Sequence, residues 1–249
     1  ACLVETGQRR IFIDPGMGLG WSRHGRLPHP FQAALAARVR AEMIAVLGRV
    51  DDVVFSHFDG DHCPLKRPNA FQLGLESVKA QLGSCRVWAK GPEGASSAQR
   101  ARREALERAL DRELAPAEGR REGPLLFSQA LPHGLKEQGA CSLMMTRIAE
   151  GGQCFVHASD IQLLDEGAVD LILDWKADCV LCSGPALYRY EGGAQELRER
   201  AWANARRLSE GVSCLVVDHH LLRAEEGLAW LAALGRVRPT RVPSPAGFR

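Results

Sequence analysis

The densest group of polar side chains in the sequence is the run from residue 57 to residue 62, which reads HFDGDH. Two imidazoles and two carboxylates lie within these six residues. Carboxylates at this density repel one another unless a cation neutralises them. Imidazole and carboxylate are also the ligands that zinc, iron and manganese take in proteins. The run therefore predicts a metal site, and the competing interpretation is a solvated polar loop.

The same residue types occur at three further places, most of them directly after an apolar, strand-like segment. These are His133, Asp160 and the pair His219 and His220. Ligands at strand ends can converge on one edge of a sheet while the strands themselves stay fixed. We therefore expect the four groups to serve one site.

The elements that must position these residues follow from the hydrophobic pattern. Short apolar runs predict strands, and apolar residues at helical spacing predict helices. Strands come first in hairpins and later alternate with helices, which indicates a mixed α/β architecture. The expected strands are Cys2–Glu5, Arg10–Asp14, Val53–Phe55, Leu125–Phe127, Ser142–Ile148, Gln153–Val156, Cys179–Cys182 and Val212–Val217, and the expected helices span 31–47, 96–114, 162–175, 194–209 and 224–234.

The composition is that of an ordinary globular protein, with 249 residues, 45% hydrophobic residues and a net charge of +2. No apolar run approaches the ~20 residues that a membrane helix needs, and no leader is expected. The eight cysteines are too few for a disulfide scaffold. Without an internal repeat or a linker, residues 1–249 are expected to form a single domain, which is soluble and cytoplasmic.

Five segments, in this order, resemble the motifs of the metallo-β-lactamase-fold superfamily: Phe12–Gly16, the run 57–62, His133, Ser159–Asp160 and His219. The resemblance spans nearly the whole chain. It implies a four-layer αββα sandwich of two mixed sheets flanked by helices, and two metal ions, commonly zinc, with a bridging water or hydroxide. Segments 27–30 and 218–223 resemble more specifically a prokaryotic branch of metal-dependent hydrolases, which supplies a fold and no substrate.

The resemblance also implies a role for each candidate ligand. The first metal would take His57, Asp59 and His133, the second Asp61, His62 and His219, and Asp160 would bridge them, with His220 as the alternate for His219. Asp61 would also orient the hydroxide in catalysis. Asp14 would lie behind the ligands and tie down their loop rather than touch metal.

Asp59 departs from the superfamily pattern, whose second motif is usually HxHxDH. A third carboxylate would leave two divalent ions and one hydroxide formally neutral. A less positive site favours manganese or iron over zinc. The metal is therefore zinc by resemblance, with manganese or iron as the alternatives that Asp59 raises.

The resulting functional prediction is a dinuclear hydrolase that attacks an ester-type or phosphodiester bond in a small anionic substrate. Lys66, Arg67 and Arg23 could hold the anionic group, and Tyr188 and Arg189 could line the substrate pocket. One alternative is a nuclease, although the chain lacks the basic stripe that binds long polyanions. The other is a non-catalytic metal-binding protein with a closed site. No membrane or nucleic-acid partner is expected, and the oligomeric state stays open.

Overall fold

The computed structural model describes residues 1–18, 27–134, 141–190 and 195–237. The chain divides into two compact units, Ala1–Ala117 and Glu118–Arg249, and each is described by itself. The expectation of a single domain stays a prediction. No helix within the described ranges is long and apolar enough to cross a membrane.

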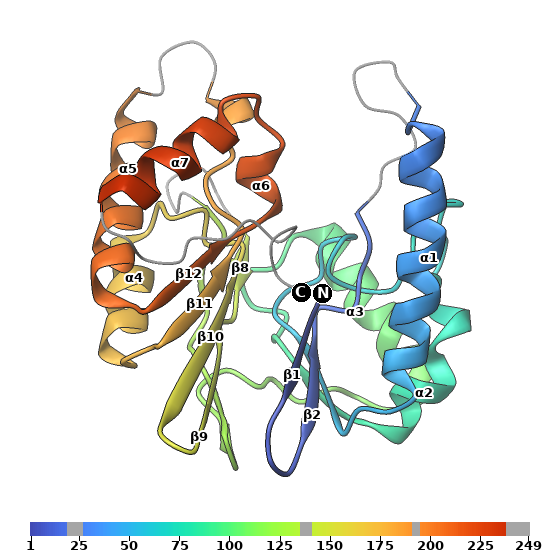
Figure 1. Cartoon of the computed structure of the whole chain (residues 1–249). Coiled ribbons are helices and arrows are strands. Elements are labelled where there is room, and N and C mark those ends of the chain that lie inside the picture. Colours follow the sequence, from blue (N-terminus) through green and yellow to red (C-terminus); the bar gives the residue numbers. More distant parts are fainter. Residues whose placement is uncertain (19–26, 135–140, 191–194, 238–249) are drawn as a thin grey trace. The chain divides into compact units, whose positions relative to one another are not determined.

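The first unit is built on a four-stranded sheet in the order β1-β2-β3-β4 (Figure 1). The strands are β1 (Cys2–Glu5), β2 (Arg10–Ile13), β3 (Asp52–Phe55) and β4 (Arg86–Ala89). β1 pairs antiparallel with β2 in the predicted hairpin, while β2, β3 and β4 run parallel. The carboxyl ends of these three parallel strands therefore meet at one edge of the sheet.

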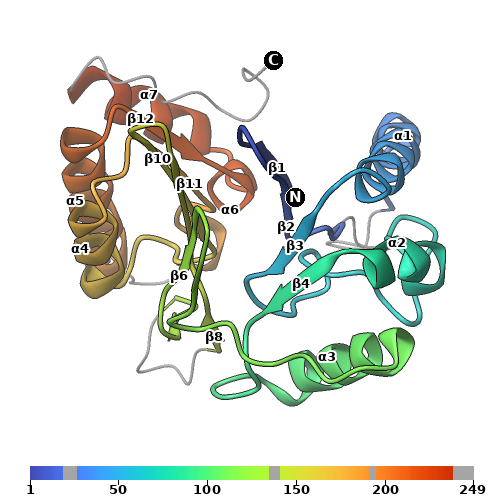
Figure 2. The same ribbon diagram turned by 90° about the horizontal axis from the view of Figure 1, so that it is seen from below.

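Helices α1 (Pro30–Leu47), α2 (Lys79–Ser84) and α3 (Ser97–Leu110) lie on one side of this sheet, and the short turn η1 spans Leu75–Ser77 (Figure 2). Their apolar faces share a core with Phe12, Val53 and Phe55 of the strands. α3 begins at a capping box, in which the Ser96 side chain accepts from the Gln99 amide. It ends at Leu110 because Asp111 takes a left-handed conformation with φ 49°.

The second unit contains a six-stranded mixed sheet in the order β12-β11-β10-β9-β6-β5 and a separate pair, β7-β8. β10, β11 and β12 run parallel, and β9, β6 and β5 continue the sheet antiparallel. The strands are β5 (Arg121–Glu122), β6 (Leu125–Phe127), β7 (Leu131–Pro132), β8 (Ser142–Leu143), β9 (Thr146–Glu150), β10 (Gln153–Ser159), β11 (Cys179–Cys182) and β12 (Cys214–Val217).

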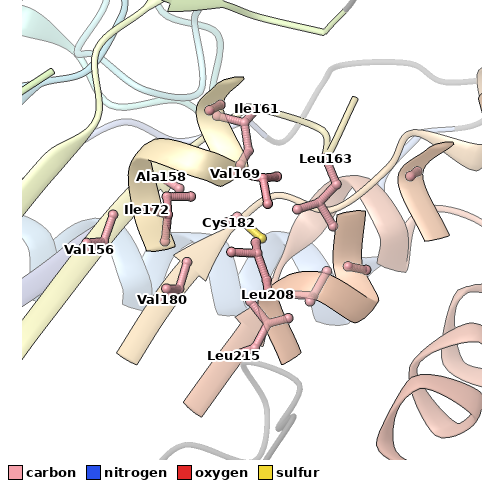
Figure 3. Packing of buried hydrophobic residues seen from close by; sticks show 14 of the residues in the cluster. Val156, Ala158, Ile161, Leu163, Val169, Ile172, Val180, Cys182, Leu208 and Leu215 are labelled. Atoms are coloured by element: carbon pink, nitrogen blue, oxygen red, sulfur yellow. The ribbon is translucent and has the colours of Figure 1, made fainter. Parts of the chain in front are cut away.

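The apolar core of this unit lies between the parallel strands and helices α4 and α5. Figure 3 shows Val156, Val180 and Leu215 of the strands packed with Ile172 of α4 and Leu208 of α5. The helices are α4 (Glu166–Asp174), α5 (Gln195–Gly211), α6 (His219–Leu222) and α7 (Gly227–Val237), with the short turn η3 at Leu187–Arg189. Burying this apolar surface fixes the ends of β10 and β12, beyond which the candidate ligands Asp160, His219 and His220 lie.

Several predicted boundaries differ from the structure: α3 ends at Leu110 rather than 114, β10 continues to Ser159, β12 begins at Cys214 and α7 spans Gly227–Val237. Two further differences have clear local reasons. The predicted strand 142–148 is two strands, because β8 pairs with β7 whereas β9 pairs with β6 and β10. The predicted helix 162–175 begins only at Glu166, because Gln162 and Leu163 have positive φ angles of 53° and 60°. Asp165 is the N-cap and accepts from the Ala168 amide at 2.8 Å.

Candidate metal centre

The HFDGDH run begins two residues after the end of β3, at the edge where the parallel strands of the first unit end. Ser56 and His57 follow β3, Asp14 follows β2 and Lys90 follows β4. Ligand sites in sheets with parallel strands lie at this carboxyl edge. The Lys90 ammonium is buried and donates to the backbone oxygens of Gly91 and Glu93.

The Asp14 side chain, which is 1% exposed, connects β2 to the ligand run through hydrogen bonds. Its Oδ1 accepts the Ser56 amide at 2.7 Å. Its Oδ2 accepts the Ser56 hydroxyl at 2.5 Å and lies 2.9 Å from Nδ1 of His62. Asp14 itself has a φ of 51°, a left-handed conformation that Asp tolerates better than most residues. The strand thus ends where the side chain turns toward the ligand run.

These hydrogen bonds select the tautomer of both histidines of the run. A carboxylate only accepts, so Nδ1 of His62 carries the proton that faces Asp14. The Ser56 hydroxyl gives its one proton to Asp14 and therefore accepts from Nδ1 of His57, 3.0 Å away. In the neutral form of each ring Nε2 is then the unprotonated nitrogen, which is the state that a metal ligand needs.

The two carboxylates of the run differ in their surroundings. Asp59 Oδ2 lies 3.7 Å from Nε2 of His57, while Asp59 Oδ1 accepts from the Gln99 amide group at 3.0 Å. The backbone oxygen of Asp59 accepts the His62 amide at 2.9 Å and so closes the turn. Asp61 is partly exposed.

Cys63, directly after the run, is not a candidate ligand. Burial raises the pKa of its thiol far above the usual value, so Cys63 stays protonated and is a poor ligand.

The loop after Asp14 packs tightly against the ligand run. A Cβ on Gly16 would lie 2.6 Å from the backbone carbon of Asp61 and would also meet backbone atoms of His62 and Cys63. Only glycine fits this close approach without moving the run. The Asp14-Pro15-Gly16 sequence therefore positions the ligands from behind.

We expect Gly16→Ala to destabilise the protein by about 1–3 kcal/mol, since the added methyl group must displace backbone atoms. The melting temperature should fall by about 2–4 °C for each kcal/mol. Gly83→Ala in α2 is the matched control, because a Cβ there has no neighbour within 4 Å. Thermal melts of both variants test this, and an equal effect of the two would contradict it.

In the second unit, Asp160 follows β10 and is 2% exposed. The register between β10 and β11 shifts between His157 and Ser159, and Ser159 has a φ of 52°. Such a bulge bends the strand and redirects the side chains after it. The Ser159 backbone oxygen accepts the Ser183 amide at 2.9 Å, which holds the end of β10 to the segment after β11.

Three imidazoles face the Asp160 carboxylate. Nε2 of His133 and Nε2 of His220 each lie 3.3 Å from Oδ2, and Nε2 of His219 lies 3.8 Å from Oδ1. His133 follows β7, and its amide donates to the backbone oxygen of Cys141 at 2.7 Å. The second unit therefore brings all four of its predicted ligand candidates together, including both members of the histidine pair.

The adjacent residues His219 and His220 differ in the group that faces Nδ1 of each ring. Nδ1 of His219 lies 3.5 Å from Oδ2 of Asp218. Burial works to raise the pKa of Asp218, but the hydrogen bond and charge of His219 outweigh it, so this pKa lies below its usual value. Among the described residues, Nδ1 of His220 has no hydrogen-bond partner. Burial lowers the pKa of His220 to about 3, so His220 is neutral.

The residues predicted to bind substrate are not among these candidate ligands. Tyr188 in η3 accepts from Nη1 of Arg223 at 3.2 Å, and the Arg189 guanidinium lies 5.7 Å from the Tyr188 ring centre. Lys66 and Arg67 are exposed. Arg23 is outside the described residues. The role of these residues in substrate binding stays a prediction.

Comparison with known proteins identifies relatives along nearly the whole chain. A UPF0282 protein of Methanosarcina mazei is 44% identical over 243 residues, which are 97% of this chain and 80% of that protein. This chain belongs to the UPF0282 family. A UPF0282 protein of Korarchaeum cryptofilum is 32% identical over 235 residues, covering 90% of this chain and 74% of that one. No family model matches the sequence.

Among solved structures, this UPF0282 protein is similar to a variant of the CmlA β-hydroxylase, with a TM-score of 0.53 and 14% identity. The match covers 97% of the chain and 49% of the hydroxylase, so the chain spans about half the length of that protein. At this identity the likeness shows the fold alone. The α/β, metallo-β-lactamase-like fold class that the sequence predicts is confirmed.

Two hydrolases match more remotely. AidC, a dizinc quorum-quenching lactonase, has a TM-score of 0.41 and 16% identity over 73% of this chain and 70% of its own. The metallo-β-lactamase SMB-1 has a TM-score of 0.37 and 15% identity over 84% of this chain and 88% of its own. These scores are too low to support a conclusion about the activity of this UPF0282 protein.

The structure adds three residues that sequence reasoning missed. Ser56 joins His57 to Asp14, and Gln99 and Arg102 reach the ligand run from α3. The Ser-x-x-Gln pattern at Ser96 and Gln99 marks a helix start, but a pattern within one helix cannot show what its side chains contact elsewhere. Ser56 was visible in the sequence as the residue between β3 and His57, with no signal of its own.

Proposed function

We propose that this UPF0282 protein is a metal-dependent hydrolase of the metallo-β-lactamase-fold superfamily, and that its two His/Asp clusters supply ligands for two divalent ions. The single observation that carries the proposal is the hydrogen-bond chain from Asp14. It holds the Nδ1–H tautomer of His57 and His62, in which Nε2 of each neutral ring is unprotonated. A solvated polar loop would not need a buried carboxylate and a serine to hold its histidines in one tautomer.

The chemistry of the donor set fits divalent ions. The second cluster adds a buried carboxylate, Asp160, faced by three imidazoles, of which His220 is neutral. We assign His219 rather than His220 as the ligand, because Asp218 faces Nδ1 of His219 in the manner of a carboxylate that orients a metal-binding histidine. Imidazoles and carboxylates in this mixture suit zinc, manganese and iron.

When bound, such ions lower the pKa of the water that they bind and polarise the substrate oxygen. The residues of the chain accept the proton and hold the ligand rings in place. Asp61, partly exposed beside the ligand histidines, orients the attacking water and accepts its proton. Asp14 holds the His62 ring, and Ser56 holds the His57 ring, so that neither has to reorganise during the reaction.

The substrate we propose is a small anionic ester or phosphodiester. Lys66 and Arg67 are exposed close to the ligand run in sequence and offer charge for one anionic group. The net charge of only +2 argues against long polyanions, which are held by many Lys and Arg contacts. We propose that the enzyme is soluble and cytoplasmic and acts on a small molecule.

The test begins with the metal content of the full chain expressed in metal-replete medium, where about two equivalents are expected, and less than one would count against the proposal. The metal-loaded protein is then assayed on small anionic esters, thioesters, lactones and phosphodiesters, and on single-stranded and duplex nucleic acid at two salt concentrations. We expect the highest kcat/KM for a small anionic substrate. A preference for the polymers that falls steeply with salt would favour a nuclease instead. Bound metal without any hydrolysis would indicate a non-catalytic metal-binding protein.

A further inference from the structure

Helix α3 places two side chains against Asp59, the one residue of the ligand run that departs from the superfamily pattern. Gln99 and Arg102 lie about one turn apart near the start of this helix, and both reach the segment from Phe58 to Asp59. Neither side chain belongs to the predicted ligand set. What they do to Asp59 follows from their hydrogen bonds.

Gln99 is 1% exposed and uses both ends of its amide group. Its Oε1 accepts the Ser96 amide at 3.0 Å, as the capping box of α3 requires. Its Nε2 is therefore the end that donates to Asp59 Oδ1, at 3.0 Å. The carboxylate is left with Oδ2 toward Nε2 of His57, 3.7 Å away.

Arg102 supplies charge on the same side. Its Nη1 donates to the Phe58 backbone oxygen at 2.9 Å and lies 3.8 Å from Asp59 Oδ1. The positive guanidinium offsets part of the negative charge that Asp59 brings. The expectation that a third carboxylate leaves the site formally neutral therefore omits a cation, and the preference for manganese or iron over zinc is weaker than the ligand set alone predicts.

We propose that Gln99 is a positioning residue that orients Asp59 as a metal ligand, and that Asp59 and Gln99 form a matched pair that a histidine at position 59 would break. This inference rests on the proposed function. A histidine that binds metal through one nitrogen carries a proton on the other. That proton would face the Nε2 donor of Gln99, and the Oε1 acceptor is already taken by Ser96. Two donors would then oppose each other.

The matched pair makes a specific prediction about substitutions. Gln99→Ala should weaken metal binding by about 10- to 100-fold, the usual effect of removing a group that orients a ligand. Asp59→His should weaken it at least as much. Gln99→Glu alone should also weaken binding, since it sets a second carboxylate against Asp59. The double variant Asp59→His/Gln99→Glu should bind metal better than Asp59→His, because a carboxylate accepts both the imidazole proton and the Ser96 amide.

Ser96→Ala is the control, since it removes the side-chain cap of α3 and leaves the bond from Gln99 to Asp59 in place. Each full-length variant, freed of metal with a chelator, is titrated with zinc and with manganese, and its melting temperature is recorded. Ser96→Ala should lower the melting temperature and leave metal affinity within about twofold of wild type.

Wild-type affinity in Gln99→Ala, an equal loss in Ser96→Ala, or no recovery in the double variant would each overturn the inference and leave the proposed function standing. Wild-type protein that binds no metal would overturn both.

Discussion

Asp61→Ala should lower kcat of the metal-loaded enzyme by on the order of 10³-fold, as expected when the group that orients the attacking water and takes its proton is lost. The free energy of unfolding should stay within about 0.5 kcal/mol of wild type. Asp61 is partly exposed, and the turn that contains it is closed by backbone atoms, through the bond from the His62 amide to the Asp59 oxygen. Its loss therefore removes a reacting group without opening the core.

Glu76→Ala is the matched control for this variant. Glu76 is an exposed acid of the same unit, paired with Lys79 at 2.6 Å on the surface. Such pairs contribute little to stability, and Glu76 is not among the candidate ligands. Activity and denaturant unfolding of both variants would be measured side by side. Full activity in Asp61→Ala would remove Asp61 from the site.

The ends of β2, β3 and β11 were predictable, to within one residue, because their signal is local. Asp14 and the HFDGDH run follow short apolar segments, and the structure ends β2 at Ile13 and β3 at Phe55. The predicted strand Cys179–Cys182 has the observed bounds of β11. When polar residues flank a short apolar segment, they mark where the strand begins and ends, and this signal does not depend on distant packing.

Features that depend on distant packing were not predictable from the pattern. The left-handed residues Gln162 and Leu163 delay the start of α4, although their residue types permit a helix. Gln99 lies 40 residues from Asp59 in sequence, and only the packing of α3 against the first sheet brings them together. The candidate ligands and Asp14 could thus be named from the sequence. Ser56 and Gln99, which contact them, could not, because they are ordinary loop and helix residues.

Asp14→Asn should strongly lower metal affinity and kcat, although the substitution hardly changes the volume of the side chain. Asp14 accepts three hydrogen bonds, two from Ser56 and one from His62. An amide offers an acceptor at one end and a donor at the other. If its oxygen keeps the Ser56 amide, its NH₂ group faces the Ser56 hydroxyl and Nδ1 of His62, both of which donate in the wild type.

The histidines must then change tautomer. His62 would give up the proton on Nδ1 and carry it on Nε2. The Ser56 hydroxyl, no longer able to donate to residue 14, would donate to Nδ1 of His57 and move that ring's proton to Nε2 as well. Both ligand nitrogens would be protonated. We expect metal affinity to fall by about 10- to 100-fold and kcat by about 10³-fold or more, since the wrong tautomer must be reversed before either ring can bind.

Imidazole nitrogen NMR on the metal-free full chain reads the tautomers directly and separates this cause from a general loss of folding. The variant should also lose about 1–3 kcal/mol of stability, the cost of a buried group whose partner no longer matches. Ser56→Ala is the control, because it removes the link to His57 and leaves the bond between Asp14 and His62 intact. The proton should therefore stay on Nδ1 of His62 in Ser56→Ala and move to Nε2 in Asp14→Asn. If Nδ1 of His62 remains protonated in both, Asp14 supports the loop mechanically and does not set the state of the ligands.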